Sequence, residues 1–262
     1  MRPLSCWSAA QRAQVRGVLT DIDDTLTTAG AITADALGAL AALRNAGLHV
    51  IAVTGRPAEW SAPFALAWPL DAIVAENGAV MLCRGPEGTL DRRYPQDAPM
   101  RARNFTRMQT VLAQIEAEVP GAHRARDSAG RECDIAIDHS EFAHLPASAI
   151  AQCAAIMRAA GMHASVSSIH INGWYGDHDK WAGACWAVRE VLGIDLAGDL
   201  DRWVYVGDST NDEVMFRHFR HSIGVANIAR FADRLEYEPS YVTQHERGAG
   251  FAEVARCLLD HA

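Results

Sequence analysis

The stretch from Val18 to Thr27 constrains the fold and chemistry of this chain more than any other part of the sequence. It reads Val-Leu-Thr-Asp-Ile-Asp-Asp-Thr-Leu-Thr, so an apolar run beginning near Val15 ends in three carboxylates within four residues. The run is short, β-branched at several positions and followed by turn-prone residues, which predicts a buried strand. At its end Asp21 and Asp23 can converge, where they repel each other unless a cation or a proton intervenes. The pattern predicts a divalent metal and two acids with different roles.

The composition is that of an ordinary globular protein. The 262 residues are 49% hydrophobic and 21% charged, enough for one large domain or two smaller ones. The net charge of −8 argues against nucleic acid or an anionic membrane as a partner, because both attract basic surfaces. We see no signal peptide, no apolar run long enough to span a bilayer and no Cys-x-x-Cys pair. We therefore expect a cytoplasmic protein with free thiols, and leave its oligomeric state open.

Strands and helices alternate along most of the chain. A helix expected from Thr33 to Asn45 is followed by a buried strand over 48–53, which ends in Thr54-Gly55-Arg56-Pro57. Strand, helix and strand within about 40 residues predict a βαβ unit with a right-handed crossover. Further core strands are expected at 72–75, 79–82, 202–206, 222–226 and 241–243. The predicted class is α/β, with a Rossmann-like, doubly wound parallel-sheet core.

The pattern changes between residues 84 and 172. Six arginines and several Pro and Gly residues occur over 84–107, and helices are expected at 104–118 and 147–160. Strands are expected at 133–138 and 165–174. This order is typical of an α+β insert and not of more doubly wound sheet. We predict a core formed by residues 1–83 and 173–262, and an inserted domain at 84–172.

Polar residues follow three of the predicted core strands: Asp21 and Asp23, then Thr54, then the segment 208–212. In an open parallel sheet, ligands bind beyond the carboxyl ends of the strands. Lys180 adds a positive charge at the start of a helix expected to run to about Gly193. An acidic metal site beside hydroxyl, amide and ammonium donors is what a bound phosphoryl group requires.

Four motifs in this order resemble those of the haloacid dehalogenase (HAD) superfamily. They are Asp21-x-Asp23-x-Thr25-Leu26, Thr54-Gly55-Arg56, Lys180 and Gly207-Asp208-Ser209-Thr210-Asn211-Asp212. The insert lies between the second and third motifs, where that family carries its C2 cap, and its α+β character resembles the C2B subgroup (subfamily IIB). Sucrose-phosphate, trehalose-phosphate and Cof-type phosphatases and phosphomannomutase belong to this subgroup. Glu76-Asn77-Gly78-Ala79 and Gly224-Val225-Ala226-Asn227 are also similar to it; Asp24 departs, since many members have Gly there.

The resemblance implies a Mg²⁺-dependent phosphatase that acts on a small phosphorylated metabolite such as a sugar phosphate. Asp21 would be the nucleophile, and Asp23 would first protonate the leaving oxygen and then activate water. Asp23 would need its pKa raised by its neighbours for the first of these roles. The implied metal ligands are Asp21, the backbone carbonyl of Asp23, and Asp208. The residues implied in binding the phosphoryl group or supporting the site are Thr54, Gly55, Lys180, Asn211 and Asp212.

The insert supplies two further candidates. Along 165–174, Ile169 and Ile171 are expected on one strand face, and Ser168, His170, Asn172 and Trp174 on the other. If the apolar face packs on the insert helices, His170 and Asn172 are free to contact the leaving group of a substrate. The alternative is that this polar face is only solvated.

Other interpretations stay open from the sequence. Asp-x-Asp alone also suits a turn, Lys180 alone a solvated lysine, and 208–212 alone a helix cap. Arg56 either binds phosphate or pairs with an acid, and we leave it out of the catalytic set. Within enzymes, a sugar phosphomutase fits the same motifs. A non-catalytic phosphometabolite-binding protein fits less well, because it has no need of a nucleophile and an acid.

Overall fold

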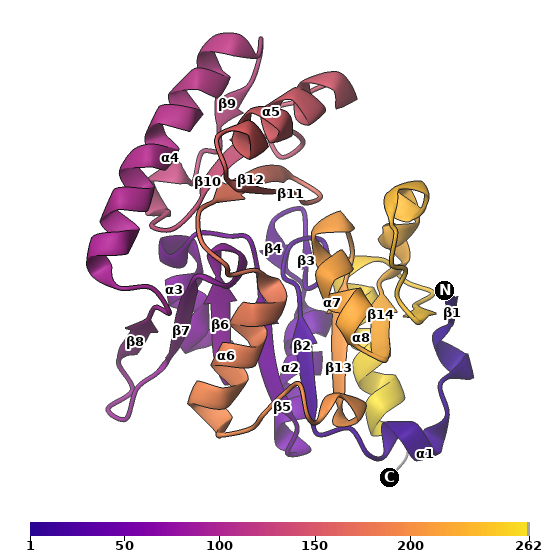
Figure 1. The fold of residues 1–262 in the computed structure, drawn as a ribbon. Coiled ribbons are helices and arrows are strands. Elements are labelled where there is room, and N and C mark those ends of the chain that lie inside the picture. Colours follow the sequence, from indigo (N-terminus) through magenta and orange to yellow (C-terminus); the bar gives the residue numbers. More distant parts are fainter. Residues whose placement is uncertain (261–262) are drawn as a thin grey trace.

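The computed structural model describes residues 1–260. They form a core domain around a nine-stranded sheet and a smaller domain above the ends of its strands (Figure 1). In spatial order the sheet contains β1 (Arg2–Pro3), β15 (Tyr241–Val242), β14 (His221–Gly224), β13 (Trp203–Gly207), β2 (Gly17–Thr20), β5 (His49–Val53), β6 (Ala72–Ala75), β7 (Val80–Arg84) and β8 (Leu90–Arg93). In this spatial order, all neighbouring strands from β1 through to β6 pair in parallel. At the other edge of the sheet, β7 pairs antiparallel with β6, and β8 pairs antiparallel with β7. The predicted α/β class is confirmed.

Helices cover both faces of this sheet. Successive residues of the central strands point to opposite faces: Val18 belongs to one hydrophobic cluster and Leu19 to the other. The first cluster includes α2 (Ala34–Asn45), α3 (Ala58–Ala67) and α8 (Arg247–Leu259), and the second includes α6 (Lys180–Leu192) and α7 (Glu213–His218). Strands buried on both faces explain the continuous apolar runs in the sequence.

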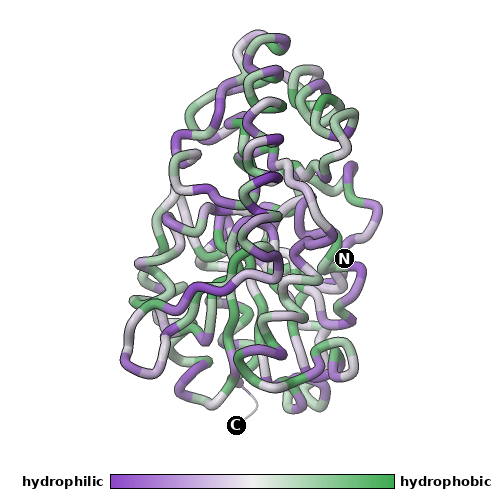
Figure 2. The backbone as a smooth tube through the Cα atoms, turned by 60° about the vertical axis from the view of Figure 1, so that its left-hand side comes forward, coloured by the Kyte–Doolittle hydropathy of each residue, from purple (hydrophilic) through white to green (hydrophobic). Residues whose placement is uncertain are grey.

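The inserted domain, which we call the cap, has its own sheet and core. Its antiparallel sheet runs β11 (His163–Val166), β12 (His170–Trp174), β10 (Ile135–Asp138) and β9 (His123–Arg124), and its helices are α4 (Ala98–Glu118) and α5 (Ala147–Ala159). Hydrophilic and hydrophobic residues alternate along α4, which buries one face against the cap sheet (Figure 2). Figure 1 shows the cap above the carboxyl ends of the core strands. The expected α+β insert is present.

Short elements complete the chain. They are α1 (Ala9–Arg12), the hairpin β3 (Thr27–Thr28) and β4 (Ala31–Ile32), and the 3-10 segments η1 (Leu4–Cys6), η2 (Glu76–Gly78), η3 (Ser128–Gly130), η4 (Leu200–Arg202), η5 (Thr210–Asp212) and η6 (Ala226–Arg234). Within residues 1–260, none of the helices is both long and apolar enough to cross a bilayer.

The expected domain boundaries fall inside strands. The boundary expected between residues 83 and 84 lies within β7, which pairs with β8 from Met81 with Arg93 to Arg84 with Leu90. Three of the six arginines that suggested a new domain, Arg84, Arg92 and Arg93, belong instead to these two strands of the core sheet, and the other three lie on α4. A boundary at 172 lies within β12. We therefore propose that the segments 94–97 and 175–179 are the two linkers between core and cap.

The strand expected over 165–174 is a hairpin. Ser167, Ser168 and Ile169 form the turn, and the Ser167 hydroxyl accepts a hydrogen bond from the backbone N–H of His170 (3.0 Å). Ile169 and Ser168 therefore do not lie on the strand faces that alternation assigned to them. A serine side chain closes this turn without Gly or Pro, which is why the sequence pattern missed it. Ile171 is buried in the cap core, as expected.

The helix expected from residue 104 starts earlier. α4 begins at Ala98, where the side chain of Asp97 accepts a hydrogen bond from the backbone N–H of Met100 (2.7 Å). Pro99 occupies its first turn, a position that proline tolerates well. The extra turn and a half brings the start of α4 down to the linker.

Candidate active site

Three neighbouring strands bring the predicted core residues together. In the sheet, β2 lies between β13 and β5. The next strand of this sheet along the chain, β5, pairs on one side of β2, and β13, which comes much later in the chain, pairs on the other side. Asp21, Thr54 and Asp208 each follow directly after one of these strands. Their backbones stay close to the sheet: the Asp21 N–H donates to the Val206 carbonyl (2.9 Å). This is the topological switch point at which open α/β sheets bind ligands.

Lys180 enters the same point from the first residue of α6. Its Nζ donates to Asp21 Oδ1 and to Asp212 Oδ1, each at 2.7 Å, and the side chain is 2% exposed. Among the 24 Lys and Arg residues of the chain, Lys180 is the single lysine. A compact ammonium on a flexible stem can bridge two carboxylates in a space too tight for the planar guanidinium of arginine.

A glycine allows α6 to approach this closely. A Cβ atom on Gly78 would lie 2.1 Å from the backbone oxygen of Asp179, and Gly78 has a φ of +107°. Glu76 and Asn77 before it also have positive φ. The Glu-Asn-Gly segment is therefore a left-handed turn that makes room for the start of α6 and so places Lys180.

The carboxylate of Asp212 is fully occupied by donors. One oxygen accepts from Lys180 and from the Tyr205 hydroxyl, and the other accepts from the backbone N–H groups of Asp208 (2.9 Å) and Ser209 (3.1 Å). Gly207 is required here, because a Cβ at that position would lie 2.5 Å from Asp212 Oδ2. Asp212 thus folds the loop that carries Asp208 and holds Lys180 in place.

Three buried carboxylates surround this single ammonium. Oxygen atoms of Asp21, Asp208 and Asp212 lie within 4.8 Å of one another. The pKa of Asp21 is raised to about 7, mainly by burial and also by the carboxylates of Asp212 and Asp23, although Lys180 opposes this rise. Burial and the Asp21 and Asp212 carboxylates also raise the pKa of Asp208 well above its ordinary value. The cluster has more negative charge than Lys180 neutralises.

One oxygen of this cluster has no donor. Asp208 Oδ2 accepts from Asn227 Nδ2 (3.0 Å), but Oδ1 is buried without a hydrogen-bond partner among the described residues. A buried acceptor without a partner is costly and calls for an explanation. A hard divalent cation, which prefers oxygen ligands, fits between Asp208 and Asp21.

Asp23 lies apart from the cluster and faces Arg56. Arg56 Nε donates to both carboxylate oxygens of Asp23 (3.0 and 2.9 Å), and Nη2 donates to Oδ1 (2.8 Å). The Arg56 side chain is 5% exposed. The sequence left open whether Arg56 pairs with an acid, and the structure shows that it does. It also binds Glu141 of the cap, which no sequence motif marked.

The other predicted core residues lie around a small enclosed space. Thr54 Oγ1 accepts from the backbone N–H of Arg56 (3.0 Å), which leaves the hydroxyl proton for another acceptor. Gly55 and Asn211 line a cavity of about 10 Å³ together with Asp21, Asp23 and Asp208. This volume holds about one water molecule, so a phosphorylated substrate needs more space than this docked arrangement of the cap leaves.

The cap closes that cavity from above. His170 and Asn172 line it, as do Ser167 and Ser168 of the hairpin turn. Both predicted cap residues are already paired within the cap: His170 Nε2 lies 2.9 Å from Glu141 Oε2, and Asn172 Nδ2 donates to Asp134 Oδ2 (2.9 Å). Both face the site, and their contact with a leaving group stays a prediction.

Asp24 points away from the cavity. It has a φ of +56°, in the left-handed region that glycine adopts most easily. Its carboxylate forms an ion pair with Arg247 at the start of α8 (2.9 Å). Its extra negative charge is therefore neutralised by the core and not by the site.

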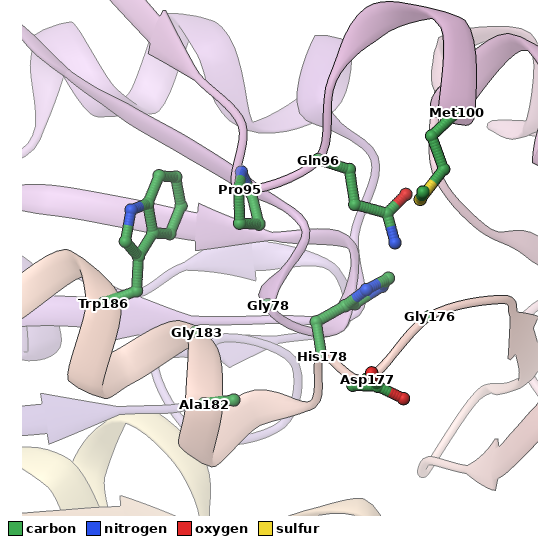
Figure 3. Close-up of a pocket in the computed structure, with 10 residues that line it drawn as sticks. All are labelled: Gly78, Pro95, Gln96, Met100, Gly176, Asp177, His178, Ala182, Gly183 and Trp186. Carbon is green, nitrogen blue, oxygen red and sulfur yellow. The ribbon is translucent and has the colours of Figure 1, made fainter.

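A second cavity lies at the linkers. It has a volume of about 330 Å³, its walls are mostly apolar, and both linkers contribute to it, through Pro95 and Gln96 and through Gly176 and His178 (Figure 3). Both ring nitrogens of His178 are buried without a partner among the described residues. None of the predicted catalytic side chains lines this cavity.

His178 gives a pH-dependent prediction for stability. Its pKa is lowered from 6.5 to about 4, mainly by burial and also by His163, although Asp179 and Asp177 oppose this shift. The unfolded chain takes up the proton first, so the free energy of unfolding should fall as the pH drops from about 6.5 to about 4. We expect this group to account for about 3 kcal/mol of that loss.

Urea denaturation between pH 4 and 7 measures the effect. The variant His178→Gln, which has no group that titrates in this range, should flatten the dependence relative to the wild type. Parallel curves for the two proteins would contradict the prediction.

Part of the chain matches a known protein family. Residues 18–97 match the family model of haloacid dehalogenase-like hydrolases, which includes the first two motifs. No curated protein matches the sequence of the chain.

Solved structures share the fold over nearly the whole chain. The sucrose-phosphatase from Synechocystis sp. PCC6803, solved with sucrose and phosphate, has 16% identity and a TM-score of 0.65, covering 94% of this chain and 98% of that one. A haloacid dehalogenase-like hydrolase from B. subtilis has 15% identity, coverage of 92% and 99%, and a TM-score of 0.64. A phosphatase of the superfamily from Bacteroides thetaiotaomicron has 15% identity, coverage of 94% and 95%, and a TM-score of 0.61. With the ordered motifs, the family match over residues 18–97 and this shared fold make the chain similar to haloacid dehalogenase-like hydrolases over nearly its whole length.

Proposed function

We propose that this protein is a Mg²⁺-dependent phosphatase that hydrolyses a small phosphate monoester, such as a sugar phosphate, through an aspartyl-phosphate on Asp21. The observation that carries the proposal is the buried pair of Asp21 and Lys180, with the unpartnered oxygen of Asp208 beside it. A buried nucleophile, a fixed ammonium and an acidic cation site meet at one sheet edge beneath a cap. The family match and the phosphatase fold support the same reaction class.

The first step would be attack of a carboxylate oxygen of Asp21 on phosphorus. Lys180 fixes Oδ1 of this carboxylate, which orients the side chain and offsets negative charge as the phosphoryl group arrives. The hydroxyl of Thr54 and the amide of Asn211 would donate to phosphoryl oxygens. As the bond to the leaving oxygen breaks, Asp23 would give that oxygen a proton. The product of this step is a mixed anhydride on Asp21.

The second step would be hydrolysis of that anhydride. Asp23, now ionised, would take a proton from a water molecule as the water attacks phosphorus, and Asp21 would be released as a carboxylate. Asp21 and Asp208, with the backbone carbonyl of Asp23, are the residues that would hold Mg²⁺. When bound, the ion would neutralise excess carboxylate charge and polarise the phosphoryl oxygens.

We propose that the cap opens to admit substrate and closes to exclude bulk water. The cavity of about 330 Å³ at the two linkers supports this proposal, because the linkers are not tightly packed there. In the closed form the remaining space near Asp21 is small and is lined by serine, histidine and asparagine side chains. Such a lining favours a compact leaving group with hydroxyls.

Phosphate release from a panel of phosphorylated metabolites, with and without Mg²⁺, tests the proposal. The panel should include hexose, pentose and triose phosphates and nucleotides. We expect release that requires Mg²⁺ and favours one of the sugar phosphates. Conversion between phosphate isomers without release would indicate a mutase, and binding without turnover would indicate a sensor; either would overturn the proposal.

The variant Asp208→Asn tests the cation site directly. We expect the Mg²⁺ concentration for half-maximal activity to rise by about tenfold or more, because one anionic ligand is lost. Without Mg²⁺ the variant should be at least as stable as the wild type, since a buried carboxylate oxygen without a partner is removed. Asp201→Asn, at an exposed side chain, is the control. An unchanged Mg²⁺ requirement in Asp208→Asn would contradict this ligand assignment.

A further inference from the structure

Arg56 joins acidic side chains from both domains. In the core it binds Asp23 through three hydrogen bonds. Toward the cap, Nη2 donates to Glu141 Oε1 (2.8 Å) and Nη1 lies 3.3 Å from Asp127 Oδ2. These ion pairs join the cap to the core residue that binds Asp23, to which the proposed reaction assigns proton transfer.

Each member of this bridge is held in place. The Arg56 guanidinium lies over the ring of Trp60, with its carbon 4.9 Å from the ring centroid. Glu141 also binds His170, and its backbone N–H donates to the carboxylate of Asp138 (3.0 Å) at the end of β10. The N–H donors of a guanidinium are fixed in one plane, so contacts on one side of the group constrain the orientation of a carboxylate bound on the other side. The compact ammonium of a lysine would not impose this constraint.

The bridge exists only while the cap is docked. Asp127 and Glu141 belong to loops of the cap, whereas Arg56 and Asp23 belong to loops at the core sheet. If the cap opens, Arg56 loses both cap carboxylates and keeps only Asp23. Asp23 would then pair with a guanidinium that only Asp23 and Trp60 hold in place.

We propose that Arg56 is a positioning residue that couples cap docking to the orientation of Asp23, with Glu141 as the cap group that sets Arg56. This rests on the proposed phosphatase function and deepens it: the docked cap would align the proton donor with the leaving oxygen, in addition to excluding water. Proton transfer from Asp23 would then require the docked cap, so a substrate bound while the cap is open would not be cleaved.

Leaving groups of graded acidity separate positioning from a structural role. In a series of para-substituted phenyl phosphates the leaving group keeps its aromatic ring and its point of attachment while its need for a proton changes. 4-Nitrophenol leaves readily without a proton, whereas unsubstituted phenol benefits from one. The ratio kcat/KM reports steps up to the first irreversible one, which is phosphoryl transfer to Asp21.

We expect Glu141→Gln to lower kcat/KM for phenyl phosphate by about tenfold or more and for 4-nitrophenyl phosphate by less than about threefold. Arg56→Lys keeps the positive charge but lacks the planar set of N–H donors, so it should also lower kcat/KM more for phenyl phosphate than for 4-nitrophenyl phosphate. The control is Glu132→Gln, which removes an ion pair with Arg92 at the same domain boundary without touching Arg56. It should leave both substrates unaffected.

Two results would overturn the proposal. Equal losses on both substrates would show that Glu141 and Arg56 act only on the fold, and no loss on either would show that they do not position Asp23. Thermal unfolding of each variant shows whether it is folded. If Glu141→Gln does not fold, the kcat/KM values of the conservative variant Arg56→Lys on the two substrates test the proposal. The absence of phosphate release by the wild type from every substrate would instead be a failure of the phosphatase function itself.

Discussion

Asp21→Asn should lower phosphate release by about 10⁴-fold or more, because an amide cannot form the covalent intermediate. No neighbouring carboxylate can substitute: Asp212 is saturated by four donors, and Asp208 is fixed by Asn227. The measurement is phosphate release at saturating substrate and Mg²⁺. Asp201→Asn, on the surface, is the matched control and should retain full activity.

The same variant should remain folded. Asn is isosteric with Asp, and it removes one of three buried like charges that repel one another. Thermal unfolding should therefore show a midpoint equal to or above that of the wild type in the absence of Mg²⁺. Substantial residual activity in a folded Asp21→Asn protein would contradict the assignment of the nucleophile.

Lys180→Met should damage both activity and stability. The ammonium is the single buried cation between Asp21 and Asp212, and removing one partner of a buried ion pair costs about 3–5 kcal/mol. Activity should fall by about 10²–10³-fold, because charge developing on the phosphoryl group loses a fixed donor. Urea denaturation and phosphate release measure the two effects.

Lys180→Arg provides the matched comparison. It keeps the positive charge, but the guanidinium is larger than the 2%-exposed position allows. We expect an intermediate loss of both quantities. A Lys180→Met protein as stable and active as the wild type would show that the bridge to Asp21 and Asp212 has no role.

The core of the site was predictable because its residues follow buried strands. Asp21, Thr54 and Asp208 each come directly after an apolar run, and parallel strands bring such positions to one edge. Lys180 could be predicted only by family resemblance, since a lysine at a helix start carries no pattern of its own. Its contact depends on the left-handed turn at Gly78, which sequence spacing does not reveal.

The cap was less predictable for physical reasons. Glu141 lies 85 positions from Arg56, in a loop without periodicity, so nothing in the sequence links the two. The edge strand β8 is rich in charge because it faces solvent, and charge was read as a domain change. The hairpin within 163–174 turns on a serine hydroxyl instead of on glycine or proline.

Trapping the covalent intermediate tests the central claim most directly. Asp23→Asn removes the proposed base, so the phosphoenzyme should persist once formed, and 4-nitrophenyl phosphate forms it without needing an acid. After incubation with the ³²P-labelled ester and Mg²⁺ and quenching in acid, we predict about one phosphate per chain. The label should be labile to hydroxylamine, lie on the peptide that contains Asp21, and be absent from the double variant Asp21→Asn, Asp23→Asn. Release of 4-nitrophenol without any labelled protein would contradict an aspartyl-phosphate mechanism.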